Sequence, residues 1–377
     1  MEKILMVDLR SQYLRIKKEI DLAIQAVIDS TDFIQGKQVA EFSNSLAAYL
    51  NSQAVIGCAN GTDALQIAMM ALDCKPGQEV ILPVHTYVAT AEVIALLGLI
   101  PVFTDVDKET FNIDVSTLED KITSNTFAIA PVHLYGQCAD MEPILKLAQK
   151  YKLHVIEDAA QALGAIYTFS DGRKMRAGTM GTIGCTSFFP TKNLGCFGDG
   201  GAIFAQDISL AEKAKIIANH GQKIKYYHDK IGINSRLDTL QAAILQVKLK
   251  YLDEYEKKRN TVATFYDQNL GSLHFLDIPF RSINSTHVFH QYTIKIKGIE
   301  RDDLKAYLQR KNIPAMVYYP VPCHLQNAYR KPGCPEGSFI VTEQLSKTLL
   351  SLPIHTEMTE EQLSYICATI KDYSLNA

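Results

Sequence analysis

Apolar and polar positions follow two different periods along this chain. Over residues 16–28 apolar side chains recur close to every 3.6 residues, which predicts an amphipathic helix, and a second such helix ends near Tyr49. Short apolar runs then alternate with helical patterns, at residues 55–58, 79–83, 101–107, 126–132 and 153–158. Strands that alternate with helices form βα units, so this part predicts an α/β fold with a mixed, mostly parallel sheet.

The pattern changes in the last third of the chain. Residues 237–252 predict a strong helix, and beyond about Tyr255 a further helix is followed by strands such as 290–296 and a helix over 302–310. No glycine-rich site accompanies these elements. We therefore predict two domains, a large one over residues 1–250 and a smaller α+β domain over residues 251–377.

Composition excludes several classes of function. The 377 residues are 47% hydrophobic and 21% charged, as in ordinary globular proteins, and the formal net charge is −3. No basic stripe stands out, so nucleic acid is not an expected partner. The longest apolar stretch, residues 93–103, contains Gly98 and Pro101 and is far shorter than the roughly 20 residues that span a bilayer. The N-terminus lacks the pattern of a signal peptide, so we expect no membrane association and a cytoplasmic location.

The eight cysteines indicate neither a disulfide framework nor a zinc site. None stands in a C-x-x-C pair, and the other spacings fit no metal-binding pattern. His287 and His290 also lack the partners of a metal site. We expect no metal, small buried thiols in a reducing compartment, and structural roles for both histidines.

One stretch, TSFFPTKNLGCFGDGG at residues 186–201, places a single lysine between an apolar run and a cluster of glycines. Upstream, the strand over residues 153–158 ends in Glu157 and Asp158. Side chains alternate along a strand, so only one of these acids can face a cofactor. An acid at a strand end and a lysine in a loop of small residues suggest a pyridoxal phosphate (PLP) site. Lys192 would form the Schiff base, and the acid would pair with the pyridinium nitrogen.

A second motif, VIGCANGTDAL at residues 55–65, indicates a strand, a tight turn and the start of a helix. The first N–H groups of a helix have no partner within it, so they form an anion site, and Gly61 and Thr62 would bind the cofactor's phosphate. The alternative is a plain N-cap at Asn60 or Thr62. The glycines of residues 195–201 lack the GxGxxG spacing of a nucleotide loop and indicate a turn that passes close to the lysine.

These motifs resemble the DegT/DnrJ/EryC1/StrS family of sugar aminotransferases, which use PLP on the aspartate-aminotransferase fold (fold type I). The resemblance runs from about Val7 to the last helix. The branch that aminates UDP-2-acetamido-2-deoxy-3-keto-hexuronic acids is closest, on the runs GCTSFFP at 184–190, GDGG at 198–201, YYH at 226–228 and GINSRLDTLQAA at 232–243. The resemblance implies a large domain with a seven-stranded sheet and a smaller C-terminal domain.

The resemblance also implies which residues hold the cofactor. It chooses Asp158 over Glu157, because a carboxylate beside the ring nitrogen keeps that nitrogen protonated and makes the ring an electron sink. It stacks Tyr87 on the ring face, although core filling is the alternative. Gln161 would donate to the phenolic oxygen, and Ser187 would give its hydroxyl to the phosphate.

Four further residues are candidates for the substrate and for the partner subunit. The resemblance implies that Asn234 reaches across a dimer interface to the partner's PLP phosphate, and the alternative for Asn234 is a helix N-cap. Arg236 carries a guanidinium that matches a sugar carboxylate, and a structural salt bridge is its alternative. In residues 317–324, Tyr319 and His324 occupy a loop that resembles one with a substrate-facing histidine.

The predicted function is a PLP-dependent aminotransferase that acts as a homodimer in cell-surface polysaccharide or lipopolysaccharide synthesis. An amino acid, usually glutamate in this family, would convert PLP to pyridoxamine phosphate, and a 3-keto nucleotide sugar would then accept the amino group. Lys192 would serve as covalent anchor and as general acid and base. Two alternatives remain, a dTDP-3-keto-6-deoxyhexose 3-aminotransferase and a PLP-binding regulator without turnover. A related branch that dehydrates its sugar has histidine in place of Lys192.

Overall fold

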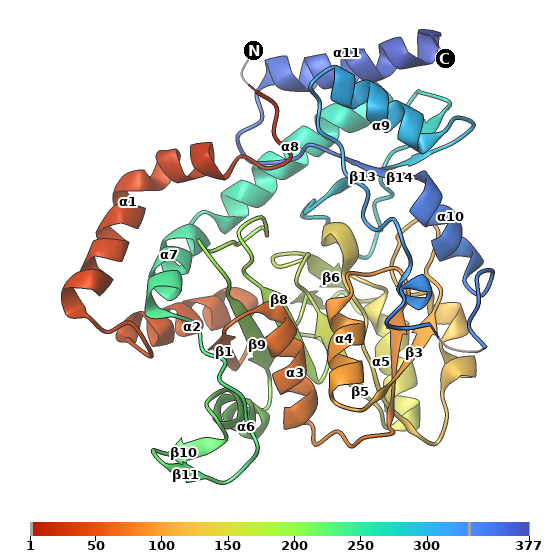
Figure 1. The fold of residues 1–377 in the computed structure, drawn as a ribbon. Coiled ribbons are helices and arrows are strands. Elements are labelled where there is room, and N and C mark those ends of the chain that lie inside the picture. Colours follow the sequence, from red (N-terminus) through yellow and green to blue (C-terminus); the bar gives the residue numbers. More distant parts are fainter. Residues whose placement is uncertain (1–2, 331–332, 377) are drawn as a thin grey trace.

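A twisted sheet of seven strands with helices on both faces forms the centre of the chain in the computed structural model, which describes residues 3–330 and 333–376 (Figure 1). The strand order is β1-β9-β8-β5-β4-β2-β3. The bounds are Ala54–Cys58 for β1, Glu79–Pro83 for β2, Ile100–Thr104 for β3, Thr126–Ile129 for β4, His154–Asp158 for β5, Ile183–Ser187 for β8 and Gly201–Ala205 for β9. Strand β9 is antiparallel to both of its neighbours, and the other pairs are parallel, so the predicted mixed, mostly parallel sheet is confirmed.

The strands bury alternate residues in different cores, because successive side chains of a strand point to opposite faces. In β2, Val80 and Leu82 join the core beneath α3, α4 and α6, whereas Ile81 joins the core beneath α5. Each such buried aliphatic side chain stabilises the fold by about 1.5–3 kcal/mol. The helices involved are α3 (Gly61–Ala71), α4 (Ala89–Leu96), α5 (Met141–Tyr151) and α6 (Ile208–Ala218).

Three long helices connect the start of the chain with its C-terminal part. They are α1 (Leu9–Ser30), α7 (Thr239–Leu249) and α8 (Leu252–Leu270), and α2 (Lys37–Leu50) packs beside α7. Helix α7 begins later than the sequence pattern indicates, with Asp238 at the N-cap position. The N-cap role left open for Asn234 is therefore wrong, because Asn234 precedes the helix by more than one turn.

The C-terminal part has its own apolar core, built from α8, α9, α11 and a small antiparallel sheet, at the top of Figure 1. Tyr266, Ile294, Leu304 and Ile366 are fully buried in it. The domain boundary near residue 250 stays a prediction. The elements are β12 (Leu276–Asp277), β13 (Tyr292–Ile296), α9 (Arg301–Arg310), α10 (Ile340–Thr348), β14 (Leu349–Leu352) and α11 (Glu360–Asn376).

Two short hairpins lie outside these layers. Strands β6 (Ile166–Thr168) and β7 (Lys174–Arg176) form one, and β10 (Gln222–Ile224) and β11 (Tyr227–His228) form the other, which stands apart from the sheet beside α6 (Figure 1). Within the described residues, no helix is both long and apolar enough to cross a membrane.

The carboxyl ends of the parallel strands meet at one edge of the sheet, which is where open α/β sheets place ligands. Strand β5 ends at Asp158, β8 ends at Ser187, and the turn from β1 to α3 runs through Gly61. Because β9 runs antiparallel to β8, the connection over residues 188–200 stays at this edge and carries Lys192.

Candidate active site

A cavity of about 800 Å³ opens at this edge, a volume typical of small-molecule sites. Its walls come from the large sheet and from the C-terminal part, which contributes His290, Gln291, Tyr318 and Tyr319. The sequence-predicted residues that line it are Gly61, Thr62, Tyr87, Asp158, Gln161, Ser187, Lys192 and Tyr319. The fold therefore gathers most of the predicted site in one place.

Lys192 carries the nucleophilic amine of this cavity. Burial lowers the pKa of Lys192 to about 8, and the Asp158 carboxylate opposes part of that effect. The lowered pKa increases the fraction of the amine that is uncharged, which is the form that a nucleophile or general base requires.

The loop of Lys192 is fixed from two sides. On one side, Asn193 Nδ2 donates to the Val288 carbonyl over 2.9 Å. On the other, the buried amine of Lys248 in α7 donates to the Gly195 carbonyl, and burial lowers the pKa of Lys248 to about 8. The sequence reasoning missed Lys248, although a lysine among the apolar positions of a helix is a usable signal.

Asp158 and Glu157 face opposite sides of β5, as strand alternation predicts. Asp158 lines the cavity, where its Oδ2 accepts from Thr90 Oγ1 over 2.9 Å and its Oδ1 accepts from the Ala160 N–H over 3.1 Å. Glu157 is fully buried and does not line the cavity. It accepts from His133 Nε2 over 2.9 Å and from the N–H groups of Gly178, Met180 and Gly181. Asp158 is therefore the carboxylate presented to a ligand, and Glu157 fixes the strand from behind.

Gln161 is held in one orientation beside Asp158. Its Oε1 accepts from the Tyr135 N–H over 2.8 Å, and its Nε2 donates to the Tyr319 hydroxyl over 3.0 Å. A side-chain amide has two N–H hydrogens, so one remains for a ligand. No local pattern of residues indicated Tyr135, which approaches Gln161 only through the packing of the loop after β4.

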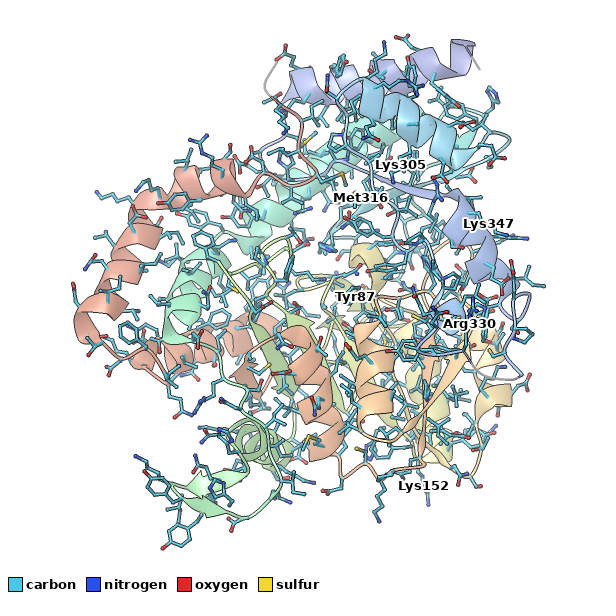
Figure 2. All side chains as sticks on the ribbon, viewed as in Figure 1. Tyr87, Lys152, Lys305, Met316, Arg330 and Lys347 are labelled. Atoms are coloured by element: carbon cyan, nitrogen blue, oxygen red, sulfur yellow. The ribbon has the colours of Figure 1, made fainter. Side chains whose placement is uncertain are left out.

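Tyr87 is the flat surface at the cavity mouth. It is 59% exposed, and its ring centroid lies 6.0 Å from that of Tyr319. In Figure 2 Tyr87 lies between α4 and the C-terminal part of the chain. An aromatic face that is free on one side fits a stacked ring, so the alternative of Tyr87 as core filler is wrong.

The start of α3 forms an anion cradle. Asn60 caps the helix by accepting from the Asp63 N–H over 2.8 Å, which leaves earlier N–H groups of the first turn without an intrahelical partner. A Cβ added to Gly61 would meet Ser187 Cβ at 2.7 Å, so only glycine lets the helix start lie this close to the serine hydroxyl. This cradle, the Lys192 amine and the Asp158 carboxylate together fit the phosphate, the aldehyde carbon and the ring nitrogen of PLP.

Asn234 and Arg236 do not line this cavity. Arg236 donates to Asn234 Oδ1 over 2.6 Å and to Asn219 Oδ1 over 3.4 Å. It faces a separate groove of about 650 Å³ together with Lys215 and Lys223. Within one chain, the two residues are therefore apart from Lys192.

His324 is also placed differently from the prediction. It is 1% exposed, its Nε2 pairs with Glu343 Oε1 over 3.0 Å, and its ring packs against Phe339. In this structure it organises the segment before α10 and does not face the cavity, so we assign it no substrate contact. His290, by contrast, lies in the cavity wall, and the structural role expected for it stays a prediction.

Comparison with known proteins places these observations in context. The sequence profile described as the DegT/DnrJ/EryC1/StrS aminotransferase family matches residues 14–371. The chain is 45% identical to the UDP-2-acetamido-2-deoxy-3-oxo-D-glucuronate aminotransferase of Pseudomonas aeruginosa, over 97% of this chain and 98% of that protein. It is also 45% identical to a protein of Geobacillus stearothermophilus named pleiotropic regulatory protein, over 98% of both chains.

Solved structures agree with the fold. DesV of S. venezuelae has a TM-score of 0.94 and 37% identity, with 99% of both chains covered. NtdA of Bacillus subtilis, solved with the bound cofactor PMP, has a TM-score of 0.89 and 30% identity, with 99% of this chain and 85% of that chain covered.

Proposed function

The chain belongs to the DegT/DnrJ/EryC1/StrS aminotransferase family and uses PLP, and from this premise we propose that it aminates a UDP-linked 3-keto-hexuronic acid. The amino donor of the proposal is an amino acid, with glutamate as the first choice. The observation that carries the proposal is the convergence of Lys192, Asp158 and Gln161 on one cavity beside an anion cradle.

Different residues of the chain have different roles in such a reaction. Bound PLP supplies an electron sink that makes the Cα–H bond of an amino donor acidic. Asp158 keeps a proton on the ring nitrogen, and Thr90 and the Ala160 N–H keep the carboxylate in place. The released amine of Lys192 would take the proton from the donor Cα and return it to the cofactor carbon C4′, which is bonded to the transferred nitrogen. Tyr87 and Tyr319 line the same cavity, with their ring centroids 6.0 Å apart.

The charges of the cavity bear on the choice of sugar. Among its described lining residues are Asp63, Asp158 and Asp199 but no arginine, and Lys192 is needed for the chemistry. A sugar with a C6 carboxylate and a nucleotide diphosphate needs further cations. Arg236, which faces away from its own chain's cavity, would supply one to the site of a partner subunit. The same lack of arginine favours, as the second candidate, a 6-deoxy keto sugar on dTDP, because that sugar has no carboxylate.

Replacement of Arg236 by Met tests the sugar. We expect kcat/KM for the UDP-linked 3-keto-uronate to fall by about 10- to 150-fold, because a charged hydrogen bond contributes roughly 1.5–3 kcal/mol. A 6-deoxy analogue should lose much less. Steady-state kinetics of wild type and variant on both keto sugars give the comparison.

Two other outcomes would count against this assignment. Equal losses on both sugars would mean that Arg236 acts only through its bonds to Asn219 and Asn234. A wild-type preference for the 6-deoxy sugar would favour the second candidate.

The proposal includes a homodimer with shared sites. The β10–β11 hairpin carries apolar and aromatic side chains that are largely exposed in its own chain, with Ile224 66%, Tyr226 78% and Tyr227 68% exposed. Exposed aromatic and aliphatic groups of this kind mark association surfaces. A partner seated there would receive Asn234 and Arg236 beside its own cavity.

Mixed dimers test this arrangement. Lys192→Ala and Asn234→Ala subunits, each weakly active alone, should recover activity when mixed, because one of the two sites in a mixed dimer then carries neither defect. The measurement is transaminase activity after subunit exchange, with exchange followed by mass spectrometry of differently tagged subunits. Absence of recovery despite complete exchange would exclude the shared site.

A further inference from the structure

Tyr135 lies in the cavity wall with a backbone conformation that few tyrosines adopt. It follows β4, and its φ and ψ angles are 58° and −3°, in the left-handed region. A residue other than glycine in this region costs free energy, so it persists only where its surroundings determine it. Such positions gather at ligand sites, and the contacts that hold Tyr135 therefore bear on the function of the cavity.

Tyr135 holds two parts of the cavity wall at once. Its backbone N–H donates to Gln161 Oε1 over 2.8 Å. Its hydroxyl donates to the Tyr318 carbonyl, which belongs to the peptide group that leads into Tyr319. The Tyr319 hydroxyl in turn accepts from Gln161 Nε2 over 3.0 Å. Gln161 and the two neighbouring tyrosines of the C-terminal part are therefore joined to Tyr135 in one closed ring of interactions.

His85 supports this ring from outside the cavity. It follows β2, is 1% exposed, and its Nε2 lies 3.0 Å from the Tyr135 hydroxyl oxygen. Tyr135 has one hydroxyl hydrogen and gives it to the Tyr318 carbonyl, so His85 is the donor to Tyr135 and carries its proton on Nε2. Burial lowers the pKa of His85 to about 4, although the Asp105 carboxylate opposes this effect, so the ring is neutral at pH 7.

The ring of His85 also contacts the other side of the network. Its centroid lies 6.2 Å from the ring centroid of Tyr135 and 6.2 Å from that of Tyr319, edge to face in both pairs. Its Nδ1 is buried and has no hydrogen-bond partner among the described residues. His85 is absent from the described residues that line the cavity. It can therefore act on a ligand only through the two tyrosines.

We propose that His85 and Tyr135 are positioning residues, which act through Tyr319 to aim the second N–H of Gln161 at the phenolic oxygen of bound PLP. A glutamine side chain turns about several single bonds, so its free N–H takes one direction only when the rest of the amide is held. Tyr135 holds the amide oxygen, and Tyr319 holds the first N–H. The inference rests on the PLP site of the proposed function and is independent of the sugar.

The pKa of lysine-bound PLP reports this hydrogen bond. A donor at the phenolic oxygen favours the form in which that oxygen carries most negative charge, which is the form without a proton on the lysine nitrogen. Loss of the donor should therefore raise the pKa. We expect a rise of about one unit in Gln161→Leu and of about half a unit in Tyr135→Phe, as befits one lost and one misdirected hydrogen bond. Titration of the visible absorbance of the holoenzyme measures both shifts.

A double-mutant cycle shows whether Tyr135 acts through Gln161. Tyr135→Phe keeps the backbone N–H to Gln161 and the ring contact with Phe111, and removes only the hydroxyl. When Gln161 is already leucine, Tyr135→Phe should add no further shift, because the group that responds is gone. Hydrogen exchange of the peptide over residues 316–323 should be faster in Tyr135→Phe, with or without PLP, since the Tyr318 carbonyl is released.

Two substitutions of His85 test the direction of its hydrogen bond. The amide of His85→Gln reaches the place of Nε2 and can donate to Tyr135, whereas the amide of His85→Asn reaches only the place of Nδ1. The pKa of lysine-bound PLP should stay within about 0.2 units of wild type in the Gln variant and rise by about half a unit in the Asn variant.

Tyr167→Phe is the matched control for the loss of a buried tyrosine hydroxyl. Tyr167 is 1% exposed, its hydroxyl donates to Asp140, and it is absent from the described lining of the cavity. This variant should lower the temperature of thermal unfolding and leave the pKa of lysine-bound PLP unaltered. A shift there would mean that the pKa responds to any loosening of the fold, which would overturn the proposal.

Three other results would also overturn it. They are an unchanged pKa in folded Tyr135→Phe, a full shift when Gln161 is already leucine, and equal behaviour of the Gln and Asn variants of His85. The titrations use no sugar, so an error in the proposed substrate would leave them intact. That error would appear separately, as absence of turnover with the UDP-linked 3-keto-uronate in a protein whose titrations behave as expected.

Discussion

Lys192→Ala is expected to lower kcat of transamination by about 10⁴-fold or more, because one amine serves both as the covalent anchor and as the general acid and base. No other amine lines the cavity among the described residues. The variant should fold normally, since the side chain lies in the cavity wall and contributes nothing to the apolar cores. The visible absorbance of lysine-bound PLP should disappear with the activity.

Steady-state assays and peptide mapping check this result. Borohydride reduction of the wild-type holoenzyme should place the cofactor on Lys192 and on neither Lys174 nor the buried Lys248. Lys174→Ala, an exposed lysine of β7, is the matched control and should retain full activity. Turnover in Lys192→Ala would falsify the assignment of Lys192 as the catalytic lysine. A wild-type chain that binds PLP without turnover would support the alternative of a PLP-binding regulator.

Asp158→Asn is expected to raise the activation barrier by about 2.7–4 kcal/mol, or about 100- to 1,000-fold in kcat. The amide cannot carry the negative charge that keeps the ring nitrogen protonated. Its single carbonyl oxygen can accept from the Ala160 N–H while its NH₂ group donates to Thr90 Oγ1, so the local fold should survive. PLP should still bind through the phosphate cradle, which absorbance titration with PLP would show.

Glu157→Gln is the control on the opposite face of the same strand. An amide there turns N–H hydrogens toward the N–H donors of Gly178 and Met180, so stability should suffer while the cavity keeps its charges. Thermal unfolding beside kcat distinguishes the two variants. Near-normal turnover in Asp158→Asn would exclude Asp158 as the partner of the ring nitrogen.

Short-range patterns predicted most of the elements of the large sheet. The period of apolar positions depends only on how side chains alternate along a strand or a helix, so β2, β4 and β5 could be placed from the sequence. The same alternation separated Asp158 from Glu157. The ends of helices depend on caps and packing, so a pattern places them less exactly. Helix α7 spans Thr239–Leu249, whereas the pattern predicted a helix over residues 237–252.

The sequence by itself determined most strands and helices of the large sheet and the motifs around Gly61, Asp158 and Lys192. Each of these depends on residues that are neighbours in the chain. Only the tertiary structure decided which distant side chains meet. It brought Thr90 to Asp158 and His290 to the wall beside Lys192, enclosed His324 against Glu343, and turned Arg236 away from its own cavity. Such contacts join residues far apart in the chain, and their geometry is set by how layers and loops pack, for which no local pattern of residues exists.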